Sequence, residues 1–133
     1  MKGLTDLLSS IKHELICSAQ DPMIESIEFD SRLCVAGSLF VAVKGYSLDG
    51  HDYIASAYEN GCRAFVVERE VDFPAEDISM VRVEDSSEAI ALLSDSFFES
   101  PSKEFKLIGI TGTNGKTTCA TLMYDLFKGL GYQ

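Results

Sequence analysis

The chain has 133 residues, of which 46% are hydrophobic and 24% are charged, and its formal net charge is −10. That size and apolar content suffice for one modest core, while the negative charge argues against non-specific binding to nucleic acid or to an anionic membrane. Asp6 interrupts the N-terminal segment, and no apolar run approaches the roughly 18 residues of a membrane span, so we expect a cytoplasmic protein without a signal peptide.

The first hundred residues show the apolar runs and helical stripes that are typical of an α/β domain. In chain order they predict a helix with one apolar face over 4–11, a strand over 26–30, a buried strand over 39–43, a helix over 53–60, a buried strand over 64–68, a strand over 80–83, and a helix that carries Ile90, Leu93 and Phe97 on one face.

Capping residues sharpen these boundaries. Thr5 is a candidate cap of the first helix, and Gly61 ends the second. Asp85 can cap the third helix, with Glu88 at the capping-box position. A serine-flanked Pro101 then marks a linker, so we expect one domain over 1–99, a linker over 100–104 and the start of a second domain over 105–133.

The cysteines form no Cys-x-x-Cys or Cys/His cluster, which argues against a zinc site. We expect reduced thiols, mostly buried as small hydrophobes, at Cys17, Cys34, Cys62 and Cys119. The aromatic side chains expected in the core are Phe40, Tyr53, Tyr58 and Phe65.

A phosphate-binding loop is predicted near the end of the chain. A strand over 105–111 leads into a glycine-bounded turn, after which a helix begins. The glycines let backbone N–H groups approach phosphate oxygens, and the helix start favours the same anion. The residues expected to bind nucleotide are Gly112, Thr113, Asn114, Gly115, Lys116, Thr117 and Thr118.

Within this loop, Lys116 offers a full charge for the outer phosphates, and Thr117 offers a hydroxyl suited to Mg²⁺. Ile110 stands where the common G-x-x-x-x-G-K-[ST] motif has its first glycine, so the loop is the shorter form G-x-x-G-K-T. The alternative is an ordinary surface turn before a helix.

The helix after this loop carries an apolar stripe that needs a sheet to pack on. A parallel sheet would require further strands after the helix, so we expect the chain to be a fragment that is inactive alone. The stripe consists of Cys119, Leu122, Met123, Leu126, Phe127 and Leu130.

Several motifs together resemble the N-terminal domain of the Mur ligases, the enzymes that build the peptide of bacterial peptidoglycan. The resemblance covers essentially the whole chain and rests on Asp30-Ser31-Arg32, on the run from Gly37 to Gly45, on Asp49-Gly50-His51, on Ala64 to Val67, and on the Gly-Thr-Asn-Gly-Lys-Thr-Thr loop about sixty residues later. It implies a small UDP-binding α/β domain followed by the first strand, phosphate loop and helix of a central ATPase domain.

The resemblance also implies site residues. Ser31 would contact the nucleotide sugar, Phe29 would lie against the uracil region, and Tyr46, Ser47 and Leu48 would line the same pocket. Their hydroxyls and flat apolar surfaces suit uracil, ribose and phosphate.

The form of the loop is similar to that of the family member that adds the third amino acid to UDP-N-acetylmuramoyl-L-alanyl-D-glutamate. The implied reaction uses ATP and Mg²⁺. The substrate carboxylate becomes an acyl phosphate, and the amine of diaminopimelate or lysine displaces phosphate. Lys116 would stabilise charge on the transferred phosphoryl group as the catalytic residue, and Thr117 would hold the metal.

Alternatives remain open at this point. They are the related ligase that adds D-alanyl-D-alanine, folylpolyglutamate synthase, which shares part of the loop, and a non-catalytic nucleotide-sugar-binding module. Asp30 and Arg32 fit an exposed ion pair as well as a functional one, whereas His51 is expected to be a structural hydrogen-bonding residue rather than a catalytic base.

Overall fold

The computed structural model describes residues 1–132, and the chain divides into two compact units at the bond between Pro101 and Ser102. The division lies within the predicted linker, while the functional identity of each unit stays a prediction. Each unit is described by itself below.

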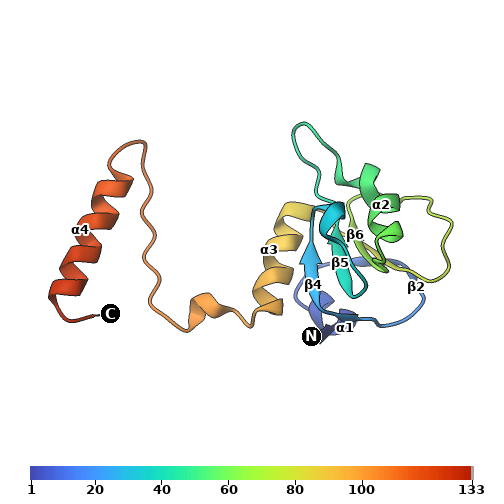
Figure 1. The fold of residues 1–133 in the computed structure, drawn as a ribbon, viewed down its shortest axis with the longest axis horizontal. Helices are drawn as coiled ribbons and strands as arrows, with labels where there is room; N and C mark the ends of the chain where they lie inside the picture. Colours follow the sequence, from blue (N-terminus) through green and yellow to red (C-terminus); the bar gives the residue numbers. More distant parts are fainter. Residues whose placement is uncertain (133) are drawn as a thin grey trace. The chain divides into compact units, whose positions relative to one another are not determined.

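The first unit is built on a five-stranded sheet (Figure 1). Four strands are parallel and adjacent in chain order, and the fifth lies antiparallel at one edge beside β7. The sheet order is β2 (Glu14–Ser18), β7 (Ser79–Arg82), β6 (Ala64–Val67), β5 (Ser38–Val41) and β4 (Ser26–Glu28). A separate two-stranded ladder pairs β1 (Lys2–Gly3) with β3 (Met23–Ile24).

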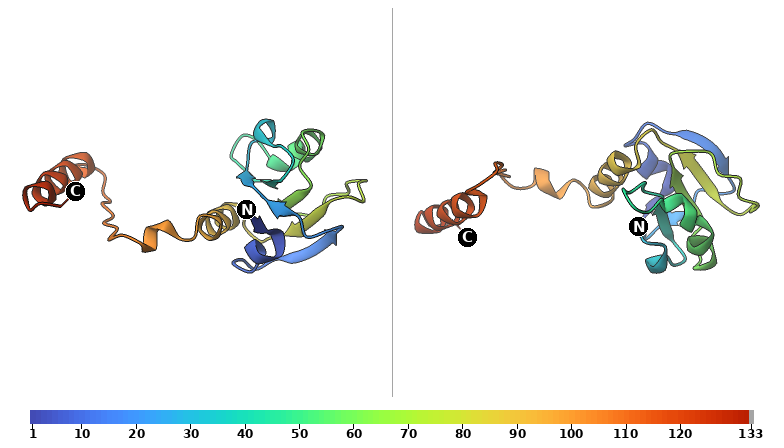
Figure 2. Two further views of the ribbon diagram at one scale, coloured as in Figure 1. Left: turned by 60° about the horizontal axis from the view of Figure 1, so that its bottom comes forward. Right: turned by 90° about the horizontal axis from the view of Figure 1, so that it is seen from above.

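Helices cover both faces of this sheet (Figures 1 and 2). Because side chains alternate along a strand, Leu39 and Val41 of β5 join the core shared with α1 (Leu4–Leu8) and α3 (Ser86–Phe97). Phe40 faces the opposite core, which α2 (Ile54–Glu59) covers. Burial on both faces explains why residues 39–41 of β5 and all of β6 are apolar, as the sequence predicted.

The helix caps are partly as predicted. The Asp85 carboxylate accepts hydrogen bonds from the N–H groups of Ser87 and Glu88, which confirms the cap of α3. Thr5 is not a cap, because α1 already begins at Leu4 with Gly3 as its N-cap residue. The exposed N–H of Thr5 is instead satisfied from outside the helix, by the Asp21 carboxylate at 2.8 Å.

The sequence did not predict β2. Its apolar residues Leu15, Ile16 and Cys17 are consecutive, so no period-two alternation is visible. A register irregularity between Leu15 and Cys17 explains this, since a bulge places neighbouring side chains on unexpected faces.

The free cysteines follow the expectation only in part. Cys34 and Cys62 are buried, Cys17 is half-buried, and Cys119 is exposed.

The second unit contains α4 (Lys116–Gly129), whose apolar stripe is exposed at Leu122, Leu126 and Leu130. The predicted strand over 105–111 is wrong, because this segment has no strand assignment in the structure. A strand needs a neighbour to pair its backbone N–H and C=O groups, and the described part of this unit holds no other strand. Across residues 1–132, no helix is both long and apolar enough for a membrane span.

Candidate functional site

The same local structure forms at two aspartate motifs, Asp30-Ser31-Arg32 and Asp49-Gly50-His51. One Asp30 carboxylate oxygen accepts the N–H of Arg32 at 3.0 Å and begins a short 3-10 helix, Ser31–Leu33. Asp49 likewise accepts the N–H of His51 at 3.0 Å and begins a second 3-10 helix, Gly50–Tyr53. An aspartate that bonds the amide two residues on is a common way to start a turn, which explains the residue type at both positions.

Both motifs lie at the carboxyl ends of neighbouring parallel strands. Ser31–Leu33 follows β4, and the loop that leads to Asp49 follows β5 and extends away from the sheet (Figure 1). From the end of α2, the Asn60 side-chain amide holds the first turn by donating to the carbonyl of Ser31 at 2.9 Å. The carboxyl edge of a parallel sheet is where α/β domains bind ligands.

A cavity of about 570 Å³ opens between these segments. Its volume lies within the range of about 300–1,000 Å³ that is usual for small-molecule sites. The lining residues are Phe29, Asp30, Ser31 and Arg32 after β4, Val43, Gly45, Leu48 and Gly50 after β5, and Tyr53 and Ser56 at the start of α2.

Three of the predicted substrate residues meet in this cavity, namely Phe29, Ser31 and Leu48. Tyr46 and Ser47 do not line it. The N–H of Gly45 donates to the carbonyl of Leu48 at 2.9 Å, so the two residues between them form the exposed tip of a turn. A ligand would therefore contact Tyr46 or Ser47 only if it extended beyond the cavity.

The cavity wall is both apolar and hydrogen-bonding. Phe29 and Leu48 are 67% and 65% exposed, so both offer apolar surface to a ligand in the cavity. Ser31 is 6% exposed and lines the cavity. A ligand could therefore gain a hydrogen bond from a hydroxyl that the protein already holds in place.

The sequence missed Tyr53, Val43 and Ser56 as lining residues. Tyr53 was expected in the core, but it is 41% exposed and forms part of the cavity wall. The expectation was wrong because the residues before α2 form a 3-10 turn, which rotates Tyr53 away from the buried face of that helix. Because ligands bind at the carboxyl ends of parallel strands, the position of Tyr53 in the segment after β5 could have indicated a lining residue.

Both turn aspartates remain ionised far below neutral pH. The Arg32 guanidinium, 2.6 Å from Asp30, lowers the pKa of that carboxyl to about 2, and the backbone N–H of Arg32 contributes. Hydrogen bonds from the backbone and the ring of His51 lower the pKa of Asp49 to about 2. The Asp30–Arg32 pair thus stabilises the first turn, and its exposed guanidinium also faces the cavity.

His51 is a structural residue, as predicted. Its side chain is buried, and its Nδ1 lies 2.5 Å from an Asp49 carboxylate oxygen. Its Nε2 accepts the N–H of Glu68 at 2.9 Å. Because an amide N–H can only donate, the ring proton belongs on Nδ1. Both ring nitrogens are therefore used within the fold and neither is available as a base.

The predicted phosphate loop lies in the second unit. Gly115 has φ 78°, a left-handed conformation that favours glycine, and is the N-cap residue of α4. No side chain caps this helix, so the N–H groups of Lys116, Thr117 and Thr118 remain available to an anion. The Lys116 ammonium donates to the carbonyl of Gly112 at 2.6 Å, which keeps it beside the loop. This donor set fits a nucleotide phosphate, and the exposed Thr117 hydroxyl fits its magnesium ion.

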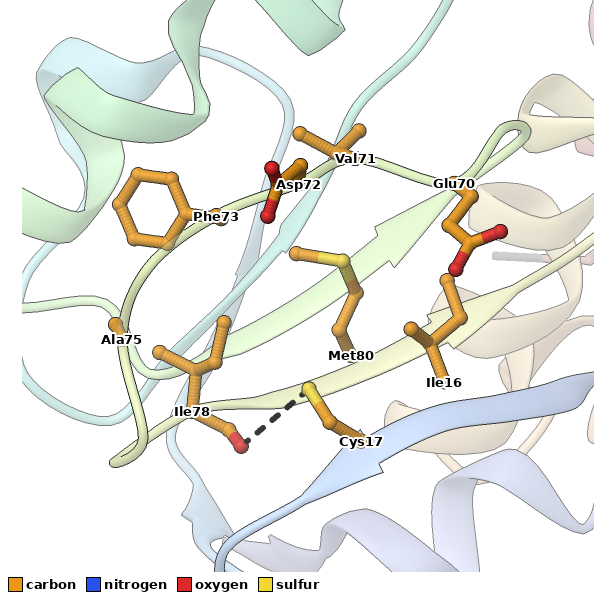
Figure 3. Close-up of a pocket in the computed structure, with 9 residues that line it drawn as sticks. All are labelled: Ile16, Cys17, Glu70, Val71, Asp72, Phe73, Ala75, Ile78 and Met80. Atoms are coloured by element: carbon orange, nitrogen blue, oxygen red, sulfur yellow. Dashed lines mark hydrogen bonds between the residues drawn. The ribbon is translucent and has the colours of Figure 1, made fainter.

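A second cavity of about 540 Å³ lies on the α2 face of the sheet, at the edge formed by β2 and β7 (Figure 3). Ile16, Ile78 and Met80 form much of its floor, and Val71 and Phe73 of the loop after β6 border it. It contains none of the predicted site residues.

Comparison with known proteins agrees with the motifs. The family described as "Mur ligase family, catalytic domain" matches residues 23–98, more than half of the chain. The UDP-N-acetylmuramoyl-L-alanyl-D-glutamate--2,6-diaminopimelate ligase of Bacillus licheniformis is 46% identical over 129 residues, which is 96% of this chain and 26% of that protein. The ligase of the same name from Cytophaga hutchinsonii is 42% identical and is covered over 27% of its length. The chain thus spans about a quarter of the length of these relatives.

Solved structures show the same relationship. A UDP-N-acetylmuramoylalanyl-D-glutamyl-2,6-diaminopimelate--D-alanyl-D-alanyl ligase from Acinetobacter baumannii aligns with a TM-score of 0.68 and 30% identity, over 88% of this chain and 26% of that one. A MurF ligase from Thermotoga maritima, solved in complex with ADP, aligns with a TM-score of 0.60 and 33% identity, over 83% of this chain and 25% of that one. Together with the α/β architecture and the two motif sites, these matches show that the chain belongs to the Mur ligase family.

Proposed function

We propose that these residues form the UDP-substrate site and the phosphate loop of an ATP-dependent ligase that adds the third amino acid to UDP-N-acetylmuramoyl-L-alanyl-D-glutamate in peptidoglycan synthesis. The observation that carries the proposal is the meeting of Phe29, Ser31 and Leu48 in one cavity at the carboxyl ends of β4 and β5. The names and the 40–46% identity of curated relatives support it.

The cavity suits the nucleotide end of such a substrate. Phe29 and Leu48 offer apolar surface to a base, and the Ser31 hydroxyl can bond uracil or ribose. Arg32 lies at the wall paired with the Asp30 carboxylate through its Nε and one terminal nitrogen, and its other terminal N–H groups can bond the diphosphate.

The loop at the start of α4 suits the phosphates of ATP, with Mg²⁺ neutralising their charge. In the proposed reaction the D-glutamyl carboxylate attacks the γ-phosphate, ADP leaves, and an acyl phosphate results. The amine of the incoming amino acid then displaces phosphate and forms the amide. Lys116 and the N–H groups at the helix start stabilise negative charge on the transferred phosphoryl group.

We propose diaminopimelate as the amino acid, because the curated relatives carry it in their names. The second candidate is addition of D-alanyl-D-alanine, which the aligned Acinetobacter baumannii ligase carries in its name. The two activities use substrates of different length, so the full-length ligase should be assayed with the UDP-dipeptide plus diaminopimelate and with the UDP-tripeptide plus D-alanyl-D-alanine. Turnover of the second pair alone would replace the first candidate.

The binding step can be tested on the chain itself. Calorimetric titration with UDP-N-acetylmuramoyl-L-alanyl-D-glutamate should show saturable binding, and Ser31→Ala should weaken it about fivefold, the effect of losing one hydrogen bond. Ser87→Ala is the matched control, since Ser87 is exposed on α3 and does not line the cavity. Equal affinities for the two variants would refute the role of Ser31, and absence of binding to the unaltered chain would refute the proposed site.

A further inference from the structure

The segment after β5 forms one wall of the cavity, and its backbone hydrogen bonds are mainly between its own residues. The N–H of Gly45 donates to the carbonyl of Leu48 at 2.9 Å, and the N–H of Gly50 donates to the carbonyl of Val43 at 3.0 Å. These bonds define the shape of the loop over 44–50. They do not determine where the loop stands relative to the opposite wall, which carries Phe29.

Glu68, just after β6, is connected to this loop at both of its ends. Its backbone N–H donates to the Nε2 of His51, directly after the loop, at 2.9 Å. Its carboxylate accepts the Ser86 hydroxyl proton at 2.6 Å. The Ser86 hydroxyl oxygen in turn accepts the N–H of Lys44, at the start of the loop, at 3.4 Å. One residue directly after a central strand thus holds both ends of the loop, one through His51 and the other through Ser86.

The Ser86 hydroxyl is not needed to cap the N-terminus of α3. The first turn of α3 is already satisfied: Glu68 accepts the N–H of Ser86 at 2.9 Å, and Asp85 accepts those of Ser87 and Glu88. Ser86 is fully buried, and burying a hydroxyl is unfavourable unless it is hydrogen-bonded. Alanine would serve the helix equally well, so the hydroxyl is explained by its bridge between Glu68 and Lys44.

We propose that Glu68 and Ser86 are positioning residues. They hold the 44–50 loop at the position in the cavity wall where it contacts the nucleotide sugar. Neither side chain lines the cavity, so both act through the loop. This inference rests on the proposed function for the identity of the ligand, but the connection between α3 and the loop is independent of it.

The test compares Ser86→Ala with Ser87→Ala in the 133-residue chain. Ser86→Ala keeps the backbone cap of α3 and removes only the bridge, so amide hydrogen exchange at Lys44 should accelerate relative to the control. Affinity for UDP-N-acetylmuramoyl-L-alanyl-D-glutamate should fall about fivefold, in line with one lost hydrogen bond. Equal exchange at Lys44 in the two variants would overturn the proposal.

A second pair keeps the proposal testable if Ser86→Ala does not fold. Glu68→Gln retains an oxygen that can accept from Ser86, and should keep wild-type affinity and exchange, whereas Glu68→Ala should lose both. Equal behaviour of these two variants would also overturn the proposal. If the unaltered chain does not bind the UDP ligand, the proposed function fails. The exchange rate of the Lys44 amide still tests whether Ser86 and Glu68 hold the loop in place.

Discussion

Replacing Gly50 with alanine should displace the loop that follows β5. A Cβ at this position would lie 2.7 Å from the N of Val43, 2.8 Å from the C of Ala42 and 2.8 Å from the O of Val43. All three are backbone atoms at the end of a buried strand, so they cannot rotate away. Such overpacking costs about 1–3 kcal/mol, and the loss of the hydrogen bond from Gly50 to Val43 adds about 1 kcal/mol.

Urea unfolding measures this effect on the first unit. A loss of about 2–4 kcal/mol, with a slope of about 2 kcal/mol per molar, lowers the urea midpoint by roughly 1–2 M. UDP-substrate affinity should fall as well, because Gly50 lines the cavity. Gly129→Ala is the control, since a Cβ there meets nothing within 4 Å. An unchanged midpoint for Gly50→Ala would refute the close-approach argument.

Three further predictions concern the cap, the turns and the phosphate loop. Asp85→Ala removes two hydrogen bonds to the first turn of α3 and should cost about 1–2 kcal/mol by urea unfolding; Glu84→Ala, a neighbouring exposed carboxylate, should leave the midpoint unchanged. Because the pKa of both Asp30 and Asp49 is lowered to about 2 from 3.8, their stabilising contribution is complete above about pH 4 and is lost as the pH falls towards 2. Circular dichroism across this window should show acid unfolding that Asp49→Asn makes shallower, and identical profiles would contradict the assignment. In the full-length ligase, Lys116→Ala should abolish turnover while leaving UDP-substrate affinity unchanged in calorimetry, and an equal loss of both would exclude the proposed division of labour.

Much of the fold was predictable because its signals are local. The runs around Leu39 and Ala64 are apolar throughout, which indicates strands buried on both faces, and both are. Asp85 was readable as a cap because a carboxylate satisfies helix N–H groups within three residues of itself. Gly61 was readable as a helix end, and its φ of 102° explains why glycine is needed there.

Two of the errors arose where a non-local partner decides the structure. The segment 14–18 becomes an edge strand because β7 lies beside it, and its bulge conceals the alternation that would have predicted it. The segment 105–111 is apolar enough for a strand, but pairing within the described second unit is absent. Tyr53 was assigned to the core from its type alone, while a 3-10 turn places it in the cavity wall.

By itself the sequence determined the chemistry that this protein can offer: the Asp-Ser-Arg and Asp-Gly-His turns, the Gly-Lys-Thr loop, and the family to which they belong. Those signals are short, because a turn or a loop is encoded within a few consecutive residues. The tertiary structure decided which of the residues that the resemblance had grouped meet in the cavity, and it left Tyr46 and Ser47 outside it. Phe29, Ser31 and Leu48 share a cavity because β4 and β5 are parallel and adjacent. Glu68 is linked to both ends of the 44–50 loop, through His51 and through Ser86, because β6 lies next to β5. Strand adjacency depends on packing across the whole sheet, and no run of neighbouring residues encodes it.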